Sequence, residues 1–187
     1  DYDKFKILGG TLDDAVGEAF DKVARVLGLN YPGGPNIEKL AREGKNNIEF
    51  PKMLKGVGGY NFSYSGLKTA VINYVHHANQ TGERVNEADV ACSFQHAATD
   101  ILVKKAIEAA KEYSLDTVTV GGGVAANGYM RENLGNACAK CGLKLVLPEK
   151  ILCTDNAAMI GAEGYVQYLK GNFADLTLNA AARVDLG

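Results

Sequence analysis

The stretch from Leu115 to Asn127, LDTVTVGGGVAAN, constrains the fold more than any other. Val118 and Val120 are β-branched residues in a short apolar run, which favours a covered strand. Three residues without a Cβ follow directly, and they let the backbone adopt left-handed conformations and approach a ligand closely: Gly121, Gly122 and Gly123. The next helix would point its free N–H groups at the same place, which suits an anion or a sugar. We expect Asn127 to cap that helix and to bind a ribose or a base, the alternative being a strand-to-helix turn without a ligand.

Composition narrows the class of protein. With 187 residues, the chain can form one substantial domain or two small ones, and 47% hydrophobic and 22% charged residues are typical of a globular protein. A formal charge of -2 gives no global attraction to nucleic acid, so any RNA contact must be local. No apolar run approaches the roughly 18 residues of a membrane span, and no signal peptide begins the chain, which predicts a cytoplasmic protein without a membrane partner. Four scattered cysteines do not indicate a disulfide framework, and the pair Cys138 and Cys141 favours two reduced thiols over a zinc or redox site.

A first helix is expected from Thr11 to about Leu27, with Thr11 as its N-cap. Helical spacing would place three acidic residues and a glycine on one face: Asp14, Gly17, Glu18 and Asp21. Like charges at this spacing repel, so the face is either well solvated or a site for hydroxyls, a metal or ammonium groups. A glycine inside a helix usually marks the close approach of another group.

Residues 30–36, NYPGGPN, predict a rigid turn in which two prolines bracket two glycines. Asn36 is expected to cap a short helix from Ile37 to Arg42 that presents Glu38 toward the turn, so that Gly34 and Glu38 could contact one ligand. A purely structural turn is the alternative. The following surface segment carries Lys52 and Lys55 as candidate phosphate contacts, or as solvated loop lysines.

Further helices and a second strand complete the expected order. Ser65 should cap a helix through Ala78, Asn86 or Glu87 should begin a long scaffold helix to about Tyr113, and a helix from Asn127 to about Cys141 should lead to a strand at Leu143–Leu147. Thr154 or Asp155 should cap the last helix, which ends near Leu169. A carboxylate at such a helix start suits a hard divalent cation, although capping alone would explain it.

Taken together, the motifs TLDDAVGEAFDK, YPGGP, FSYSGLKTA, GGGVAAN and CTDNAAMI resemble, in order and spacing, the tRNA adenosine threonylcarbamoyltransferase family, formerly called O-sialoglycoprotein endopeptidase or glycoprotease. The resemblance implies an α/β fold of the actin-like ATPase (ASKHA, ribonuclease H-like) type, with a mixed sheet flanked by helices. Residues 1–187 would form the C-terminal lobe of a two-lobed protein, with a largely helical insertion at about 30–114 and with the N-terminal lobe absent.

The resemblance also implies a function and a site. The family transfers a threonylcarbamoyl group from threonylcarbamoyl-adenylate to the adenosine beside the tRNA anticodon. By matching motifs, Asp21, Gly34 and Asn127 resemble ligand-contacting positions, and Glu38 stands where many members carry Asp. Asp155 resembles the aspartate that ligates a divalent metal, iron or zinc. The implied ligand is an adenylate or ATP-type nucleotide, and the implied partners are tRNA, a paralogous TsaB-like subunit, a small TsaE-like ATPase and the N-terminal lobe.

One departure from the family pattern shapes our expectations. The family's other metal ligands are two histidines spaced HxxxH, whereas this sequence holds three histidines without that spacing: His76, His77 and His96. We therefore expect this chain alone to be inactive, to bind nucleotide weakly and to form artificial dimers through an exposed cleft. The alternatives are a metalloprotease, which the absence of HExxH disfavours, a noncatalytic nucleotide-binding scaffold lobe, and a sugar or acetate kinase of the same fold.

Overall fold

The computed structural model describes residues 5–51 and 59–180. By its internal contacts the chain divides into a large unit, Lys6–Thr154, and a small unit that joins residues 1–5 to residues 155–187. The candidate phosphate contacts Lys52 and Lys55 lie outside the described residues.

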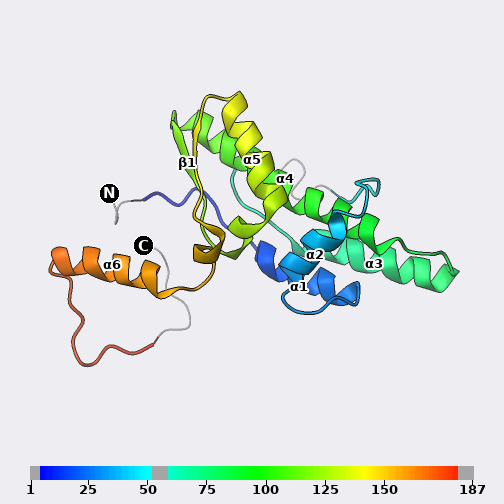
Figure 1. Cartoon of the computed structure of the whole chain (residues 1–187), viewed down its shortest axis with the longest axis horizontal. Coiled ribbons are helices and arrows are strands. Elements are labelled where there is room, and N and C mark those ends of the chain that lie inside the picture. Colours follow the sequence, from blue (N-terminus) through cyan, green and yellow to red (C-terminus); the bar gives the residue numbers. More distant parts are fainter. Residues whose placement is uncertain (1–4, 52–58, 181–187) are drawn as a thin grey trace. The chain divides into compact units, whose positions relative to one another are not determined.

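Four helices form the first half of the large unit (Figure 1): α1 (Val16–Val26), α2 (Gly33–Ala41), α3 (Ser65–Thr81) and α4 (Glu87–Glu112). Helix α2 packs against both α1 and α4, and the rings of Phe20 and Phe94 meet edge-on with centroids 5.0 Å apart. Ile37, Val71 and Val90 are fully buried in the same core. The apolar residues at spacings of three and four therefore meet in one cluster, as amphipathic helices require.

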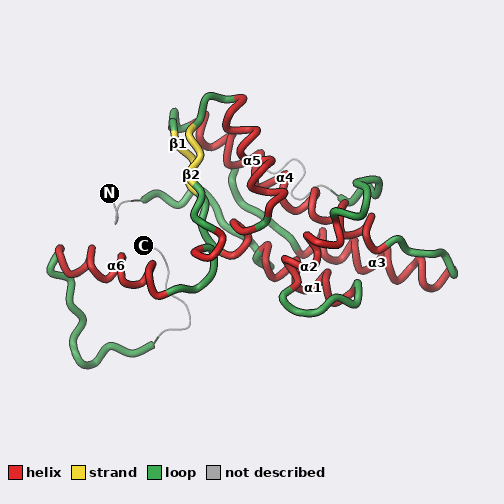
Figure 2. The backbone as a smooth tube through the Cα atoms, in the orientation of Figure 1, coloured by secondary structure: helices red, strands yellow, loops and turns green. Residues whose placement is uncertain are grey.

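The second half of the large unit is a β-α-β segment (Figure 2). Strand β1 (Thr117–Thr119) pairs in parallel with β2 (Lys144–Val146), and Val118 lies opposite Leu145. Between them run a short 3₁₀ helix, η1 (Gly123–Ala126), and helix α5 (Gly128–Lys140). A second core joins these elements to α4 through Val103 and Ile107. The α/β class and the strand, glycine turn and helix are thus confirmed, while the described part of the sheet is a parallel pair rather than the mixed sheet expected.

The last part of the large unit is a single 3₁₀ turn, η2 (Lys150–Leu152). The small unit contains helix α6 (Ala157–Leu169). Its N-cap is Asn156, whose side chain accepts a hydrogen bond from the Met159 N–H, so the predicted caps Thr154 and Asp155 are wrong. None of the described helices combines the length and the apolar composition that crossing a membrane would need.

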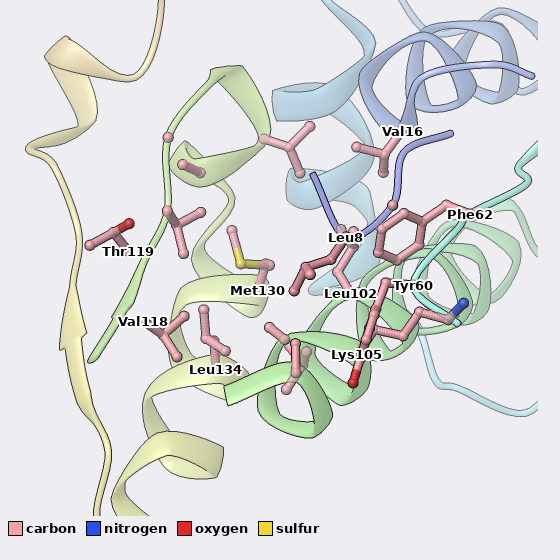
Figure 3. A pocket seen from close by; sticks show the side chains of 18 residues that line it. Leu8, Val16, Tyr60, Phe62, Leu102, Lys105, Val118, Thr119, Met130 and Leu134 are labelled. Carbon is pink, nitrogen blue, oxygen red and sulfur yellow. The ribbon is translucent and has the colours of Figure 1, made fainter. Parts of the chain in front are cut away.

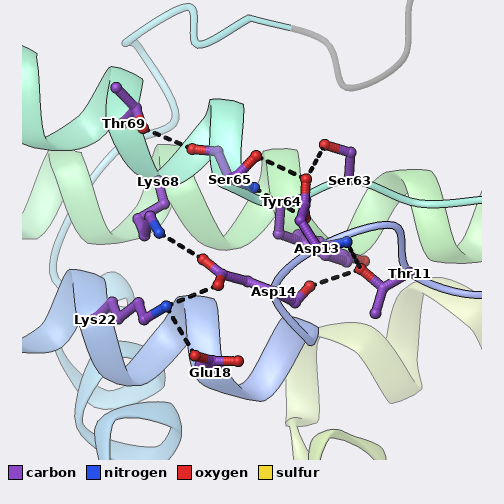
Figure 4. A network of polar contacts seen from close by, with 10 residues as sticks. All are labelled: Thr11, Asp13, Asp14, Glu18, Lys22, Ser63, Tyr64, Ser65, Lys68 and Thr69. Carbon is purple, nitrogen blue, oxygen red and sulfur yellow. Dashed lines mark hydrogen bonds and ion pairs between the residues drawn. The ribbon is translucent and has the colours of Figure 1, made fainter.

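The predicted starts of α1 and α3 are also wrong, and Asp13 lies close to both (Figure 4). Helix α1 begins only at Val16, which leaves Asp13 in the preceding loop. There Asp13 Oδ1 accepts hydrogen bonds from the backbone N–H of Tyr64 at 2.7 Å and of Ser65 at 3.2 Å, and Oδ2 accepts from Ser65 Oγ at 2.7 Å. Asp13 therefore caps α3 from 51 residues away in sequence, and Ser65 is the first helical residue rather than the cap. Thr11 donates its hydroxyl to the Asp14 carbonyl and does not cap α1.

The hydrogen bonds around Asp13 also determine the pKa of its carboxyl group. Burial acts to raise that pKa, but the hydrogen bonds from Ser63, Ser65 and the N–H of Tyr64 outweigh it and hold the pKa well below the usual 3.8. A carboxylate with a lowered pKa in the folded state contributes stability that is present above its unfolded pKa and is lost as pH falls toward the folded value. The contribution of Asp13 is therefore complete near neutral pH and declines below about pH 4.

We predict that Asp13→Asn destabilises the large unit by about 1 kcal/mol at pH 7, because the amide replaces one acceptor oxygen with a donor at a helix start. Urea denaturation followed by circular dichroism should show that this difference shrinks between pH 4 and pH 2.5. Asp116→Asn is the control, since that carboxylate accepts a bond from the neighbouring Thr117 hydroxyl at an exposed position. An unchanged difference between wild type and Asp13→Asn across this range would contradict the capping role.

Candidate functional site

The glycine turn after β1 opens onto solvent. Gly121, Gly122 and Gly123 are exposed, and Gly122 has φ +88°, a conformation that side-chain-bearing residues rarely adopt. The carbonyl of Gly122 accepts the Ala125 N–H at 2.9 Å, which closes the 3₁₀ turn η1. Outside the elements themselves, the N–H groups of Gly121 and Gly122 meet no acceptor in the described part of the chain. The turn therefore offers exposed donors of the kind that bind phosphate oxygens.

Asn127 joins η1 to α5 and serves as the N-cap of α5, as expected. Its Oδ1 accepts the Met130 N–H at 2.9 Å, and its Nδ2 donates to Gln95 Oε1 on α4, also at 2.9 Å. Asn127 is 7% exposed and Gln95 5%. The capping prediction succeeds here because donor and acceptor lie three residues apart.

Asp21, on α1, contacts the start of α2. The N–H of Gly33 donates to Asp21 Oδ1 at 2.7 Å, and a Cβ on Gly33 would lie only 2.6 Å from the Asp21 Cα. Only glycine allows the two helices to approach this closely. The second oxygen of Asp21 accepts no hydrogen bond from residues 5–51 and 59–180, so it can accept one from a ligand.

The proline-flanked turn differs from the expectation in its capping. Helix α2 begins at Gly33 rather than Ile37, so Asn36 lies inside it and is not its cap. Its Nδ2 instead donates back to the carbonyls of Asn30 and Pro32, at 2.8 and 2.9 Å. Because α2 starts early, Gly34 is a helical residue, and a Cβ there would meet no atom within 4 Å.

Glu38 lies four residues after Gly34 and therefore on the same side of α2. Its Oε1 accepts from Arg42 at 2.7 Å and lies 2.8 Å from where a Cβ on Gly128 would be. The Glu38 carboxylate thus packs against the first residue of α5. A negative group at a helix N-terminus is favourable, and it also makes this point better suited to hydroxyl groups than to a phosphate.

These contacts bring four of the predicted site residues together. Asp21 touches the start of α2, α2 carries Gly34 and Glu38, and Glu38 touches the residue that follows Asn127. A Cβ on Gly17 would lie 3.7 Å from Val124, which places α1 beside η1 as well. The predicted site therefore consists of α1, α2, the glycine turn and the start of α5.

The acidic face predicted on the first helix is only partly confirmed. Asp14 precedes α1 and binds Lys22 at 2.7 Å and Lys68 at 2.6 Å, while Glu18 binds Lys22 at 2.8 Å. The hydrogen bonds from both lysines lower the pKa of Asp14. Asp14 and Glu18 are thus engaged in ion pairs, and Asp21 is the acid of this set that faces α2.

Asp155 belongs to the small unit, two residues before α6, and its side chain is exposed. Within residues 5–51 and 59–180, no group of three or more His, Cys, Asp or Glu side chains could hold a metal ion. A single exposed carboxylate does not fit a complete metal site.

The histidines and the cysteine pair take structural positions. His76 and His77 are exposed on α3, whereas the His96 Nδ1 lies 2.8 Å from the Tyr129 hydroxyl, which donates to Asp100 at 2.9 Å. Burial, together with the bond to Asp100, raises the pKa of Tyr129. Both cysteines of the CxxC pair are free thiols, and burial raises the pKa of Cys138, which fits an unreactive thiol.

Two supporting residues were not predicted from the sequence. Gln95 holds Asn127, and Arg131 donates to the carbonyls of Ala125 and Pro148, both at 2.8 Å, which ties η1 to the segment after β2. The only sequence signal for Gln95 was its polar side chain next to Phe94 and three residues before Ala98 on the predicted buried stripe.

A pocket of about 380 Å³ lies between α4, β1 and the segments around Leu8 and Phe62, and its wall reaches Gly121, Val124 and Ala125 of the glycine turn and η1 (Figure 3). Its walls are mostly aliphatic, and the Lys105 ammonium at its edge is bound by the carbonyls of Gly59 and Asn61. This mostly apolar pocket therefore suits an apolar group better than a nucleotide, and the polar convergence around Asn127 beside it is the stronger candidate site.

Comparison with solved structures shows that parts of HypF proteins share this fold. The chain matches the crystal structure of T. kodakarensis HypF with a TM-score of 0.61 and 25% identity, over 85% of this chain and 20% of that one. It also matches a full-length HypF in the phosphate- and nucleotide-bound form, with a TM-score of 0.61 and 18% identity over 83% of this chain and 20% of that one, a likeness of fold alone.

Sequence comparison then identifies the family. The TsaD family model, described as tRNA N6-adenosine threonylcarbamoyltransferase, matches residues 1–162. Relatives of that name from Moorella thermoacetica and Staphylococcus aureus (strain JH9) are 55% and 49% identical, over 96% and 100% of this chain. The chain belongs to the tRNA N6-adenosine threonylcarbamoyltransferase family. It spans about half the length of these relatives, 53% and 54% respectively.

We predict opposite effects of alanine at the two neighbouring glycines of α2. Gly33→Ala should destabilise the fold by about 1 to 3 kcal/mol, because the new methyl group collides with the Asp21 backbone and with Ala24. Gly34→Ala should change stability by less than about 1 kcal/mol, in the stabilising direction, because the methyl group meets open space and alanine favours a helix. Urea denaturation measures both, and equal losses would contradict the close contact between α1 and α2.

Proposed function

We propose that this chain is the adenylate-binding half of an enzyme that transfers a threonylcarbamoyl group to the adenosine beside the tRNA anticodon. The observation that carries the proposal is the convergence of Asp21, Gly34, Glu38 and Asn127 next to an exposed glycine turn, in a chain of this family. Carboxylates beside glycines suit ribose hydroxyls, and free backbone N–H groups suit a phosphate.

Each part of the site has a distinct role in the proposal. The second oxygen of Asp21 and the carboxylate of Glu38 accept hydrogen bonds from ribose hydroxyls. Gly34, where a Cβ would meet nothing, leaves room for the sugar. The exposed N–H groups of Gly121, Gly122 and Gly123 bind the phosphate of the adenylate, away from the Glu38 carboxylate.

The proposed reaction needs no covalent enzyme intermediate. The adenosine amine attacks the carbamoyl carbon, a C–N bond forms, the bond between that carbon and the adenylate phosphate oxygen breaks, and AMP leaves while the amine loses a proton. The proposed site residues hold and orient the adenylate, which contributes through proximity.

The proposal also includes a metal ion and several macromolecular partners. Asp155 would be one ligand of an iron or zinc ion, and the remaining ligands would have to come from outside the described residues, so no step is assigned to the ion. The other proposed partners are tRNA, a TsaB-like paralogous subunit and a TsaE-like ATPase.

A chimera tests the proposal directly. We expect that replacing the matched part of the Moorella thermoacetica relative with residues 1–187 gives a protein that forms threonylcarbamoyladenosine in tRNA, measured by mass spectrometry of digested nucleosides, while the 187-residue chain alone forms none. Asn127→Ala in the chimera should lower kcat/KM at least tenfold, because a buried site amide is lost. Asn136→Ala, at an exposed position of the same helix, is the matched control.

Gly34→Ala in the same chimera separates ligand contact from folding. A Cβ at position 34 would meet no described protein atom within 4 Å. A loss of turnover with unchanged thermal stability would therefore mean that the new methyl group collides with the bound ligand. Turnover at the wild-type level in both Asn127→Ala and Gly34→Ala would refute this placement of the adenylate.

A further inference from the structure

The orientation of the Asn127 side chain is fixed by an ordered chain of hydrogen bonds. The backbone N–H of Met130 can only donate, so the atom that faces it must be the amide oxygen of Asn127. The amide nitrogen of Asn127 therefore faces Gln95, and Gln95 must present its own oxygen.

Gln95 can hold this position firmly because its surroundings are buried. It lies on α4 between Phe94 and Ala98, both with no exposed surface, and its backbone carbonyl accepts the buried Thr99 hydroxyl at 2.7 Å. The hydrogen bond between the side chains of Gln95 and Asn127 is itself buried. A buried hydrogen bond between well-packed partners has little freedom to rearrange.

The geometry points to Gln95 as a positioning residue for ligand binding by Asn127, an inference that rests on the function proposed above. Gln95 uses one of the two Nδ2–H groups of Asn127, which leaves the other to donate to a ligand at the start of α5. Without the acceptor oxygen of Gln95, the amide nitrogen of Asn127 loses its partner, and the side chain can rotate away from the orientation that the ligand needs. An acidic side chain at position 95 would keep the required acceptor.

A double-mutant cycle on the 187-residue chain tests this role with AMP as the probe, its affinity measured from NMR chemical-shift changes. We expect Gln95→Met to weaken AMP binding about 5- to 30-fold, and Gln95→Glu to stay within about twofold of wild type because it keeps the acceptor. In an Asn127→Ala background, Gln95→Met should have less than a twofold further effect, because the group that Gln95 orients is gone. Circular dichroism verifies that each variant is folded.

The outcomes distinguish the proposals. Equal losses from Gln95→Met in both backgrounds, or no loss in the wild-type background, would overturn the positioning role. Unchanged AMP affinity in Asn127→Ala, or no AMP-dependent shift at the start of α5 in the wild-type chain, would instead count against the proposed function. If Gln95→Met does not fold, the NMR signals of the Asn127 side-chain amide in the wild-type chain provide the test. One Nδ2 proton should resist exchange with solvent, and the other should shift when AMP is added. Rapid exchange of both protons would overturn the inference.

Discussion

The hydrogen bond from the Gly33 N–H to the Asp21 carboxylate determines how the candidate site is assembled. It requires the first residue of α2 to lie against the backbone of α1, which only a residue without a Cβ permits. Once α2 is fixed there, its next turn carries Gly34 and Glu38 along one side, and Glu38 reaches the first residue of α5. A single close approach between two helices therefore brings residues from three helices together at the candidate site.

Carboxylates take different roles in this structure according to their partners. Asp13 accepts several hydrogen bonds at the start of α3, and Asp14 is held between two lysines, so both stabilise the fold (Figure 4). Asp21 has one oxygen engaged by a backbone N–H, while its other oxygen has no partner among the residues that the structure describes. All three residues are acidic, so charge does not distinguish them. Asp21 is the candidate ligand residue because one of its oxygens can still accept a hydrogen bond.

Much of the candidate site could be predicted from the sequence, and the missing part has a physical explanation. Gly34, Asn127 and the glycine turn could be proposed from the sequence because their chemistry is local: a turn, a cap and a run of residues without side chains. Gln95 and Arg131 were missed because they act through contacts with elements 32 and 17 residues away. The relation of Asp155 to the other site residues stays a prediction.

The sequence by itself determined which segments become helices and strands, since hydrophobic spacing and turn residues act within a few positions along the chain. It also determined the cap at Asn127 and limited the start of α4 to Asn86 or Glu87; the structure shows Asn86 as the cap, and both caps bind the backbone two or three residues ahead. Only the tertiary structure decided the start of α3, because the carboxylate that caps it comes from Asp13, far away in sequence. Hydrogen bonds of that kind form only after helices pack, so their partners are set by the three-dimensional arrangement and not by the local pattern of residues.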